Sequence, residues 1–171
     1  LFLLGRRAEP VREATADEDP LLALPTGPVL GVLPFENLSV DTRQEYFSDG
    51  VTDDIITALS RFKDLFVIAR NSTFRYKGQA VDVRQLHREL GARYVLEGSV
   101  QRAGDTLRVT AQLLDAKDGT HLWAETYDRE LSASSVFAVQ DEITEQVVAT
   151  IGGSQGVISQ RRFAEVKNKP T

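Results

Sequence analysis

Residues 29–62 read VLGVLPFENLSVDTRQEYFSDGVTDDIITALSRF and decide the fold. The stretch opens on a continuous apolar run, which is typical of a strand buried on both faces of a sheet. Pro34 ends this run, because proline cannot donate a hydrogen bond to a neighbouring strand. An apolar stripe at helical spacing follows at Val51, Ile55, Ile56, Leu59 and Phe62. The stretch therefore predicts a strand, an irregular connection and an amphipathic helix.

The next segment contains a second strand and a second helix. Residues 65–69 (LFVIA) are short and apolar, which predicts another buried strand. The polar and aromatic residues 70–80 (RNSTFRYKGQA) are expected to form a loop. A helix is predicted from about Asp82, and Gly91 is well placed to end it, because glycine readily adopts the left-handed conformation of a C-cap.

From Tyr94 the apolar pattern changes to a period of two, which indicates strands with one buried face. Turns at Gly104-Asp105 and Asp118-Gly119 divide this region into an antiparallel meander of three strands, the last over residues 121–127. A final amphipathic helix is predicted from about Ser134, with Gly152-Gly153 placed to break it.

The element order β-α-β-α-β-β-β-α predicts an α/β domain on a mixed five-stranded sheet. Two crossover helices imply that the first three strands are parallel neighbours, and the meander extends the sheet antiparallel. We place this domain at residues 29–153. Residues 1–28 are expected to be a membrane-proximal stub and a disordered, proline-rich linker, and residues 154–171 a helical or extended connector. Residues 1–4 (LFLL) are either the end of a transmembrane helix or a frayed chain end.

The composition excludes several kinds of function. The 171 residues carry a net charge of −5, which weighs against direct nucleic-acid binding, because binders usually need a basic face. The chain has no cysteine, which rules out disulfides and thiolate metal sites. Its two histidines, His87 and His121, do not form a recognisable catalytic arrangement with a serine and an aspartate. We therefore expect no catalytic residue, no metal and no cofactor.

Carboxylates gather at the predicted start of the first helix. Asp49, Asp53 and Asp54 could bind a divalent cation. The preferred interpretation is structural: Ser48 or Asp49 caps the helix, and Asp53 and Asp54 lie in its first turns, where the dipole favours anions.

The best candidate for ligand or partner contact is the aromatic-basic stretch Phe74-Arg75-Tyr76-Lys77, together with Arg70 and Asn71. Alternating aromatic and basic side chains can stack on bases and contact phosphates, and loops on a rigid scaffold often carry function. The alternative is a loop that covers a sheet edge with its aromatic rings and leaves its charges in water. Arg70 could also be a structural ion-pair partner.

The sequence as a whole resembles one bacterial family, the TolB-like amino-terminal domain of multidomain signalling proteins. Five segments carry the resemblance: VLPFENLS (32–39), EYFSDGVTDDIITALSR (45–61), LFVIARNSTFRYKG (65–78), LGARYVLEGSVQRAGDTLRVTAQLLDAKDGTHLWAETYDR (90–129) and VFAVQDEIT (136–144). In such proteins this domain typically follows a class III adenylate/guanylate cyclase domain or a winged-helix DNA-binding domain, and precedes tetratricopeptide repeats. The resemblance implies a fold like the amino-terminal domain of TolB and gives the domain no catalytic role.

The resemblance also implies a cellular setting. A transmembrane helix often precedes the domain in this family, so the parent protein is expected to be membrane-anchored. A cytoplasmic cyclase before a single span would place the domain in the periplasm, whereas Arg6-Arg7 after an apolar stub favours the cytoplasm; we expect the periplasm.

We therefore expect a non-catalytic sensory or regulatory domain of a signal-transduction protein. Its partners would be the cyclase or winged-helix domain and the repeats of its parent chain, with an envelope protein or a small ligand as further candidates. The alternative is a protein-interaction or assembly module whose surface is the edge of the meander or residues 70–78. A hydrolase or metal-dependent enzyme is the third and least favoured hypothesis.

Overall fold

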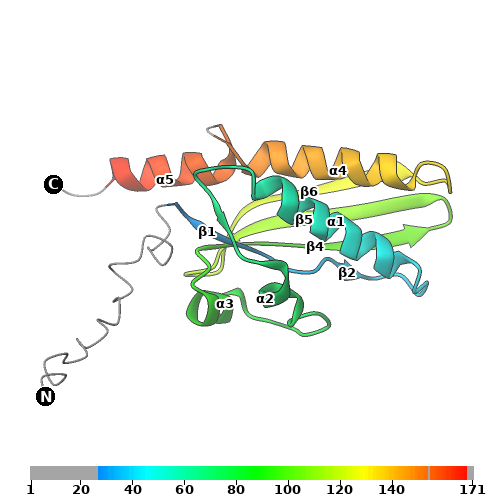
Figure 1. Ribbon diagram of the computed structural model, residues 1–171, viewed down its shortest axis with the longest axis horizontal. Helices are drawn as coiled ribbons and strands as arrows, with labels where there is room; N and C mark the ends of the chain where they lie inside the picture. Colours follow the sequence, from blue (N-terminus) through cyan, green and yellow to red (C-terminus); the bar gives the residue numbers. More distant parts are fainter. Residues whose placement is uncertain (1–26, 154, 169–171) are drawn as a thin grey trace, which may run out of the picture.

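The computed structural model describes residues 27–153 and 155–168, which form a mixed sheet with helices on both faces (Figure 1). The strands are β1 (Val29–Val32), β2 (Glu36–Asn37), β3 (Phe66–Val67), β4 (Tyr94–Ala103), β5 (Thr106–Asp115) and β6 (Thr120–Glu130). The helices are α1 (Gln44–Leu59), α2 (Arg70–Phe74), α3 (Val83–Leu90), α4 (Val136–Ile151) and α5 (Val157–Lys167). The predicted stub and the linker up to Thr26 lie outside the described residues.

The sheet has the predicted topology with one added strand. Its main path runs β3-β1-β4-β5-β6, with β1 parallel to both of its neighbours and with β4, β5 and β6 antiparallel to one another. The expected α/β fold class and strand directions are confirmed. The sixth strand is the two-residue β2, which pairs with β4 in parallel after β1 has ended.

The two faces of the sheet are covered unequally. Helices α1 and α4 lie side by side over one face and enclose the main core (Figure 1). A smaller core lies on the other face, where Val83 and Leu86 of α3 pack with Val95 of β4 and Leu114 of β5. Beyond this smaller core the second face of β4, β5 and β6 is open, since its side chains Gln101, Arg108 and Thr126 are exposed. An open sheet face beside a covered one is where a groove can form.

Helix α1 begins earlier than the sequence pattern predicts. Ser48 and Asp49 lie inside the helix rather than at its cap, and the Ser48 hydroxyl donates to the Gln44 carbonyl oxygen at 2.9 Å. The additional turn is stabilised by Phe47, which is buried in the main core four residues before Val51. The prediction of a cap at Ser48 or Asp49 is therefore wrong, because the apolar stripe continues one turn further towards the N-terminus.

Residues 65–80 also differ from expectation. The strand β3 has only two residues and lies at the sheet edge, where Phe66 is half exposed. Residues 70–74 are helical (α2) and not a loop. This short helix packs inward through Thr73, which is 1% exposed and donates its hydroxyl to the Arg70 carbonyl oxygen.

Helices α3 and α4 follow the sequence signals closely. The Asp82 carboxylate caps α3 by accepting from the Arg84 backbone N–H, and Gly91 ends the helix with φ of 69°. Helix α4 ends at Ile151, directly before Gly152. Helix α5 follows; its Ile158 is buried in the main core, and Arg93 joins it to the sheet through Glu165 at 2.6 Å. None of the helices within the described residues is long and apolar enough to cross a membrane.

The passage from β1 to β2 depends on the fit between Phe35 and Gly98. The Phe35 backbone N–H donates to the Thr52 hydroxyl of α1 at 3.0 Å, and its buried ring lies against Gly98 of β4. A methyl group on Gly98 would come within 2.6 Å of Phe35 Cε2 and 2.4 Å of the Thr110 carbonyl oxygen. Glycine is thus required here by lack of space and not by its backbone angle.

We predict that Gly98→Ala destabilises the chain by about 1–3 kcal/mol, the usual cost of overpacking a core. Urea denaturation followed by circular dichroism measures this loss. Gly31→Ala in β1 is the matched control, because its new methyl group would meet only ordinary contacts of 3.5 Å or more. Equal stability of the two variants would show that Phe35 does not pack on Gly98 in this way.

Candidate functional site

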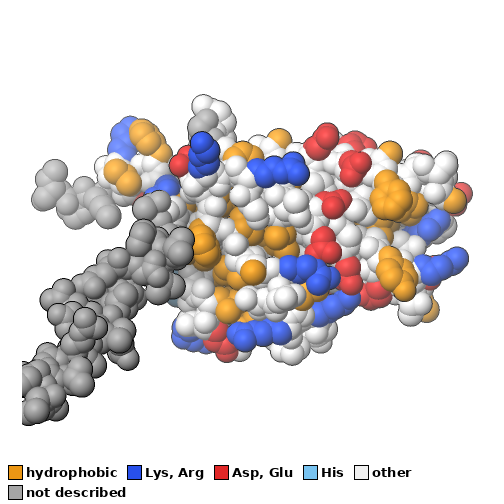
Figure 2. Space-filling view, viewed as in Figure 1, with side chains coloured by type: hydrophobic (Ala, Val, Ile, Leu, Met, Phe, Trp, Pro, Cys, Tyr) orange, Lys and Arg blue, Asp and Glu red, His pale blue; other side chains and the backbone are white. Residues whose placement is uncertain are grey.

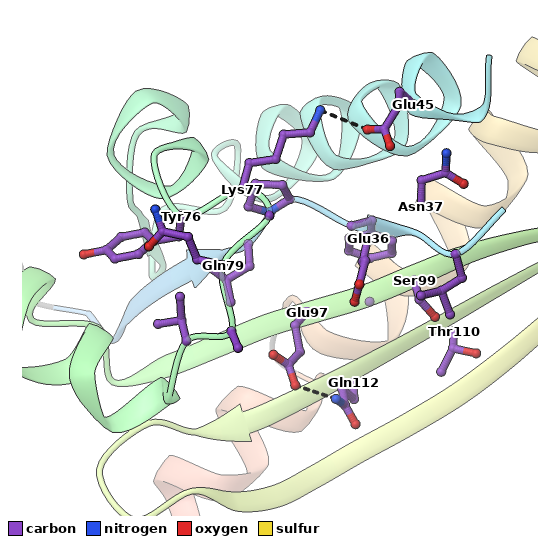
Figure 3. A pocket seen from close by; sticks show the side chains of 18 residues that line it. Glu36, Asn37, Glu45, Tyr76, Lys77, Gln79, Glu97, Ser99, Thr110 and Gln112 are labelled. Atoms are coloured by element: carbon purple, nitrogen blue, oxygen red, sulfur yellow. Dashed lines mark hydrogen bonds and ion pairs between the residues drawn. The ribbon is translucent and has the colours of Figure 1, made fainter. Parts of the chain in front are cut away.

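A groove of about 780 Å³ lies where the open sheet face meets the segment between α2 and α3 (Figure 3). We call it the β4–β5 groove. It is lined by residues of the β1–β2 connection, of the segment after α2 and of strands β4 and β5, with Glu45 from α1: Leu33, Pro34, Phe35, Glu36, Asn37, Leu38, Glu45, Tyr76, Lys77, Gly78, Gln79, Ala80, Val81, Glu97, Gly98, Ser99, Thr110 and Gln112.

Strand register builds the floor of the groove from two rows of polar side chains. Glu36, Ser99 and Thr110 are partners across β2, β4 and β5, so their side chains share one face. Glu97 lies two residues before Ser99 on the same face, and the side-chain amide of its partner Gln112 donates to its carboxylate. Hydroxyl, amide and carboxylate groups therefore stand next to one another on a flat base.

One wall of the groove is the segment of residues 76–81, which two side chains fix in place. The buried Tyr76 hydroxyl donates to Glu89 of α3 and accepts from Arg75 at 2.8 Å. Lys77 spans to α1, where its Nζ lies 2.7 Å from the nearer Asp49 oxygen and 3.1 Å from Glu45. The hydrogen bond to Asp49 and, after it, that to Glu45 raise the pKa of Lys77, while burial acts in the opposite sense.

Only part of the predicted contact region reaches this groove. Tyr76 and Lys77 line it, whereas Arg70, Asn71, Phe74 and Arg75 do not. The structure therefore separates the six residues into two groups.

The cations of the aromatic-basic stretch and Arg70 are paired within the chain. Arg70 forms an ion pair with Asp53 and lies over the Phe74 ring, 3.9 Å from its centre. Arg75 lies 3.8 Å from Glu89. Asn71 is exposed on α2. Each of these cations thus already has a carboxylate partner, as does Lys77.

The acidic residues of α1 have a different role from the one predicted. The helix begins at Gln44, so its first turn ends before Asp49, Asp53 and Asp54. These carboxylates are therefore not placed to interact with the positive end of the helix dipole. Asp49 and Asp53 instead pair with Lys77 and Arg70, and Asp54 accepts from the Gln140 amide of α4 at 2.6 Å. Within the described part of the chain no three metal-ligating side chains come together.

Most residues of the groove are not among those predicted from the sequence. The polar positions 97, 99, 110 and 112 alternate with apolar ones along two predicted strands, and this signal could have identified an open polar face. Glu36 could not have been found in this way, because its place depends on the pairing of β2 with β4. The histidines lie outside the groove; His87 Nδ1 is 2.8 Å from the Ala92 carbonyl oxygen, and His121 is exposed.

We predict that Lys77→Ala loosens the segment of residues 76–81. Its side chain is 41% exposed, so the loss of unfolding free energy should not exceed about 1 kcal/mol. Amide hydrogen exchange across residues 76–81 should nevertheless become faster. Lys117→Ala, at an exposed lysine between β5 and β6, is the matched control and should leave this segment unchanged.

The same contact predicts a response to alkaline pH. Because the pKa of Lys77 is raised by folding, its contribution is complete below its unfolded value of about 10.4 and is lost as the pH rises through the folded value. Protection of residues 76–81 should fall over this range in the parent chain and show no such step in Lys77→Ala. Identical exchange profiles in the two proteins would contradict the role assigned to Lys77.

Comparison with solved structures finds the same fold in two other bacterial proteins. Lipoprotein GNA1162 from Neisseria meningitidis matches with a TM-score of 0.51 and 20% identity over 72% of this chain and 99% of that protein. A PelC dodecamer subunit from Paraburkholderia phytofirmans matches with a TM-score of 0.50 and 20% identity over 74% of this chain and 90% of that subunit. At this identity the likeness concerns the fold alone.

Sequence comparison gives a closer relationship. "Putative adenylate cyclase 3" of Rhizobium meliloti (strain 1021) is 56% identical over 130 residues, which is 76% of this chain and 22% of that protein. The chain thus spans about a fifth of that relative, and the expected link to cyclases is supported at the level of a shared segment. Residues 26–146 match the family model of the HilA/YgeH-like transcriptional regulator, second domain. The chain therefore belongs to the family of HilA/YgeH-like transcriptional regulator second domains.

Proposed function

We propose that the chain is a non-catalytic regulatory domain of a bacterial signal-transduction protein, joined in its parent protein to a class III adenylate cyclase domain. The observation that carries this proposal is the unequal coverage of the 56% match, which takes in 76% of this chain but 22% of the putative cyclase. A segment of that size is one part of a larger protein, so the cyclization of ATP would belong to another part.

The geometry supports a binding role for this part. The β4–β5 groove presents hydroxyl, amide and carboxylate side chains on a rigid sheet, which suits recognition of a ligand or partner. Lys77 joins the wall of this groove to α1, and α1 packs along α4. Occupation of the groove could thus be transmitted to the helical layer through the Lys77 contact.

The setting of the parent protein is part of the proposal. We infer a membrane helix before the domain, a periplasmic position for the domain, and tetratricopeptide repeats after it, with a winged-helix regulator as the other parent architecture. The membrane helix, the periplasmic position and the repeats rest on the resemblance to signalling proteins. The winged-helix alternative is supported by the match to a transcriptional regulator family.

The proposal predicts distinct behaviour of the chain alone and of the full-length relative. The 171-residue chain should form no cyclic AMP from ATP. Deleting the matching segment from the full-length putative adenylate cyclase 3 should change the rate of cyclic AMP formation, measured with purified protein, because the regulatory input is lost. Cyclic AMP formation by the 171-residue chain, or an unchanged rate after the deletion, would refute the proposal.

A second candidate function, assembly with other protein subunits, is favoured by exposed aromatic residues. Tyr46 in the first turn of α1 is 84% exposed, and Phe137 in the first turn of α4 is 77% exposed. Figure 2 shows hydrophobic side chains standing out at the end of the molecule where these two helices begin. Aromatic residues are enriched in protein interfaces.

Sedimentation equilibrium separates this candidate from the first. An assembly module should form a concentration-dependent oligomer that Tyr46→Ser with Phe137→Ser dissociates. Phe163→Ser, at another exposed aromatic residue on α5, is the control. A strict monomer at all concentrations would remove self-assembly from consideration.

A further inference from the structure

Two carboxylates in the β4–β5 groove have no cationic partner among the described residues. Glu36 is the cross-strand partner of Ser99 and Glu97 lies two residues before Ser99 on β4, so the two glutamates are diagonal neighbours on the open face of the sheet. In Figure 3 the Glu36 side chain extends from β2 over the sheet, and the Glu97 carboxylate is directed towards Gln112. Glu97 accepts a hydrogen bond from the neutral Gln112 amide, and within the described chain neither carboxylate forms an ion pair.

The lining of the groove is negatively charged as a result. It contains Glu36, Glu45 and Glu97 against a single cation, Lys77. Lys77 already forms ion pairs with Glu45 and Asp49 of α1. Its charge is therefore not available to Glu36 and Glu97 on the floor of the groove. Diagonal neighbours on one sheet face are within reach of a long side chain, so one cationic group could contact both carboxylates.

We propose that the β4–β5 groove binds an extended, arginine-containing segment of a partner protein, with the guanidinium group between Glu36 and Glu97. A planar guanidinium can donate to both carboxylates at once, which a point charge does less well. The partner of the groove is thus a polypeptide with an arginine side chain. This rests on the proposed regulatory function only in that binding in the groove is taken to be the regulatory signal.

The shape and chemistry of the groove favour a polypeptide over a small cation. Its volume of about 780 Å³ is within the range of ligand sites, but such sites are mostly apolar and enclosed. The base of this groove is the open sheet face, where Thr110 and Gln112 follow one another along β5 and Ser99 lies beside Thr110, so polar groups are available along the strand. Pro34 and Leu38 also line the groove and could contact the aliphatic stem of an arginine.

A labelled peptide tests this inference directly. Fluorescence anisotropy would measure binding of the 171-residue chain to a fluorescein-labelled pentapeptide of alternating serine and arginine. The matched probe replaces each arginine by citrulline, which keeps the shape and removes the charge. The arginine peptide should bind at least about tenfold more tightly, as expected for charge-assisted hydrogen bonds, and it should also bind more tightly than free arginine amide.

Variants of the chain locate the site. Glu36→Gln and Glu97→Gln should each weaken binding of the arginine peptide about tenfold or more. Glu125→Gln is the matched control: it removes the same charge from an exposed glutamate of β6 whose strand partner, Ala111, faces the main core. Glu36 is itself exposed, so its substitution should leave the thermal unfolding temperature unchanged.

Three results would overturn the inference. They are equal binding of the citrulline peptide, an equal loss of binding in Glu125→Gln, and equally tight binding of free arginine amide. Peptide binding is measured without any cyclase, so the outcome is independent of the deletion experiment. Specific peptide binding with an unchanged cyclase rate would refute the proposed regulation and leave the binding site intact.

Discussion

The architecture depends on how Phe35 is held between α1 and β4. Its backbone N–H, which β1 no longer uses, donates to the Thr52 hydroxyl, and Thr52 in turn donates to the Ser48 carbonyl oxygen at 2.7 Å. Its ring fills the space that Gly98 leaves open. A buried N–H without a partner would cost about 1–3 kcal/mol, so these contacts define where the chain leaves β1. Helix α1 and the sheet are joined at this point.

The groove is a consequence of these contacts of Phe35 with Thr52 and Gly98, which together are called the Phe35 anchor. Because Phe35 turns inward, the chain returns to β4 one step later and forms β2, which sets Glu36 beside Ser99. Meanwhile α3 covers the other face only as far as the smaller core, and Lys77 holds the intervening segment against α1. A polar sheet face, a displaced strand and a fixed wall together form the cavity. No single element carries the site, which explains why its residues are spread over 80 positions from Leu33 to Gln112.

The local signals in the sequence predict most of the fold. Helix α3 is predicted from its caps at Asp82 and Gly91, and the meander from its turns and from the period of two. These signals act over only a few residues. The sequence pattern places the start of α1 one turn too late although Phe47 continues its apolar stripe, because polar residues interrupt the pattern. The site is harder to predict: composition singles out Tyr76 and Lys77, but their carboxylate partners lie 13 and 28 residues away in the sequence. Pairing over such distances is decided by tertiary structure.

The most direct test of this account is the hydrogen-exchange rate of the Leu38 amide in a Thr52→Val variant. Leu38 donates to the Val100 carbonyl oxygen beyond the Phe35 anchor, whereas Leu33 donates to Leu96 before it. Valine keeps the branched shape of threonine and removes the acceptor for Phe35. The account predicts faster exchange at Leu38 with little change at Leu33. Equal rates at Leu38 in both proteins, or the same acceleration at both amides, would contradict the claim that this anchor positions β2 and the groove.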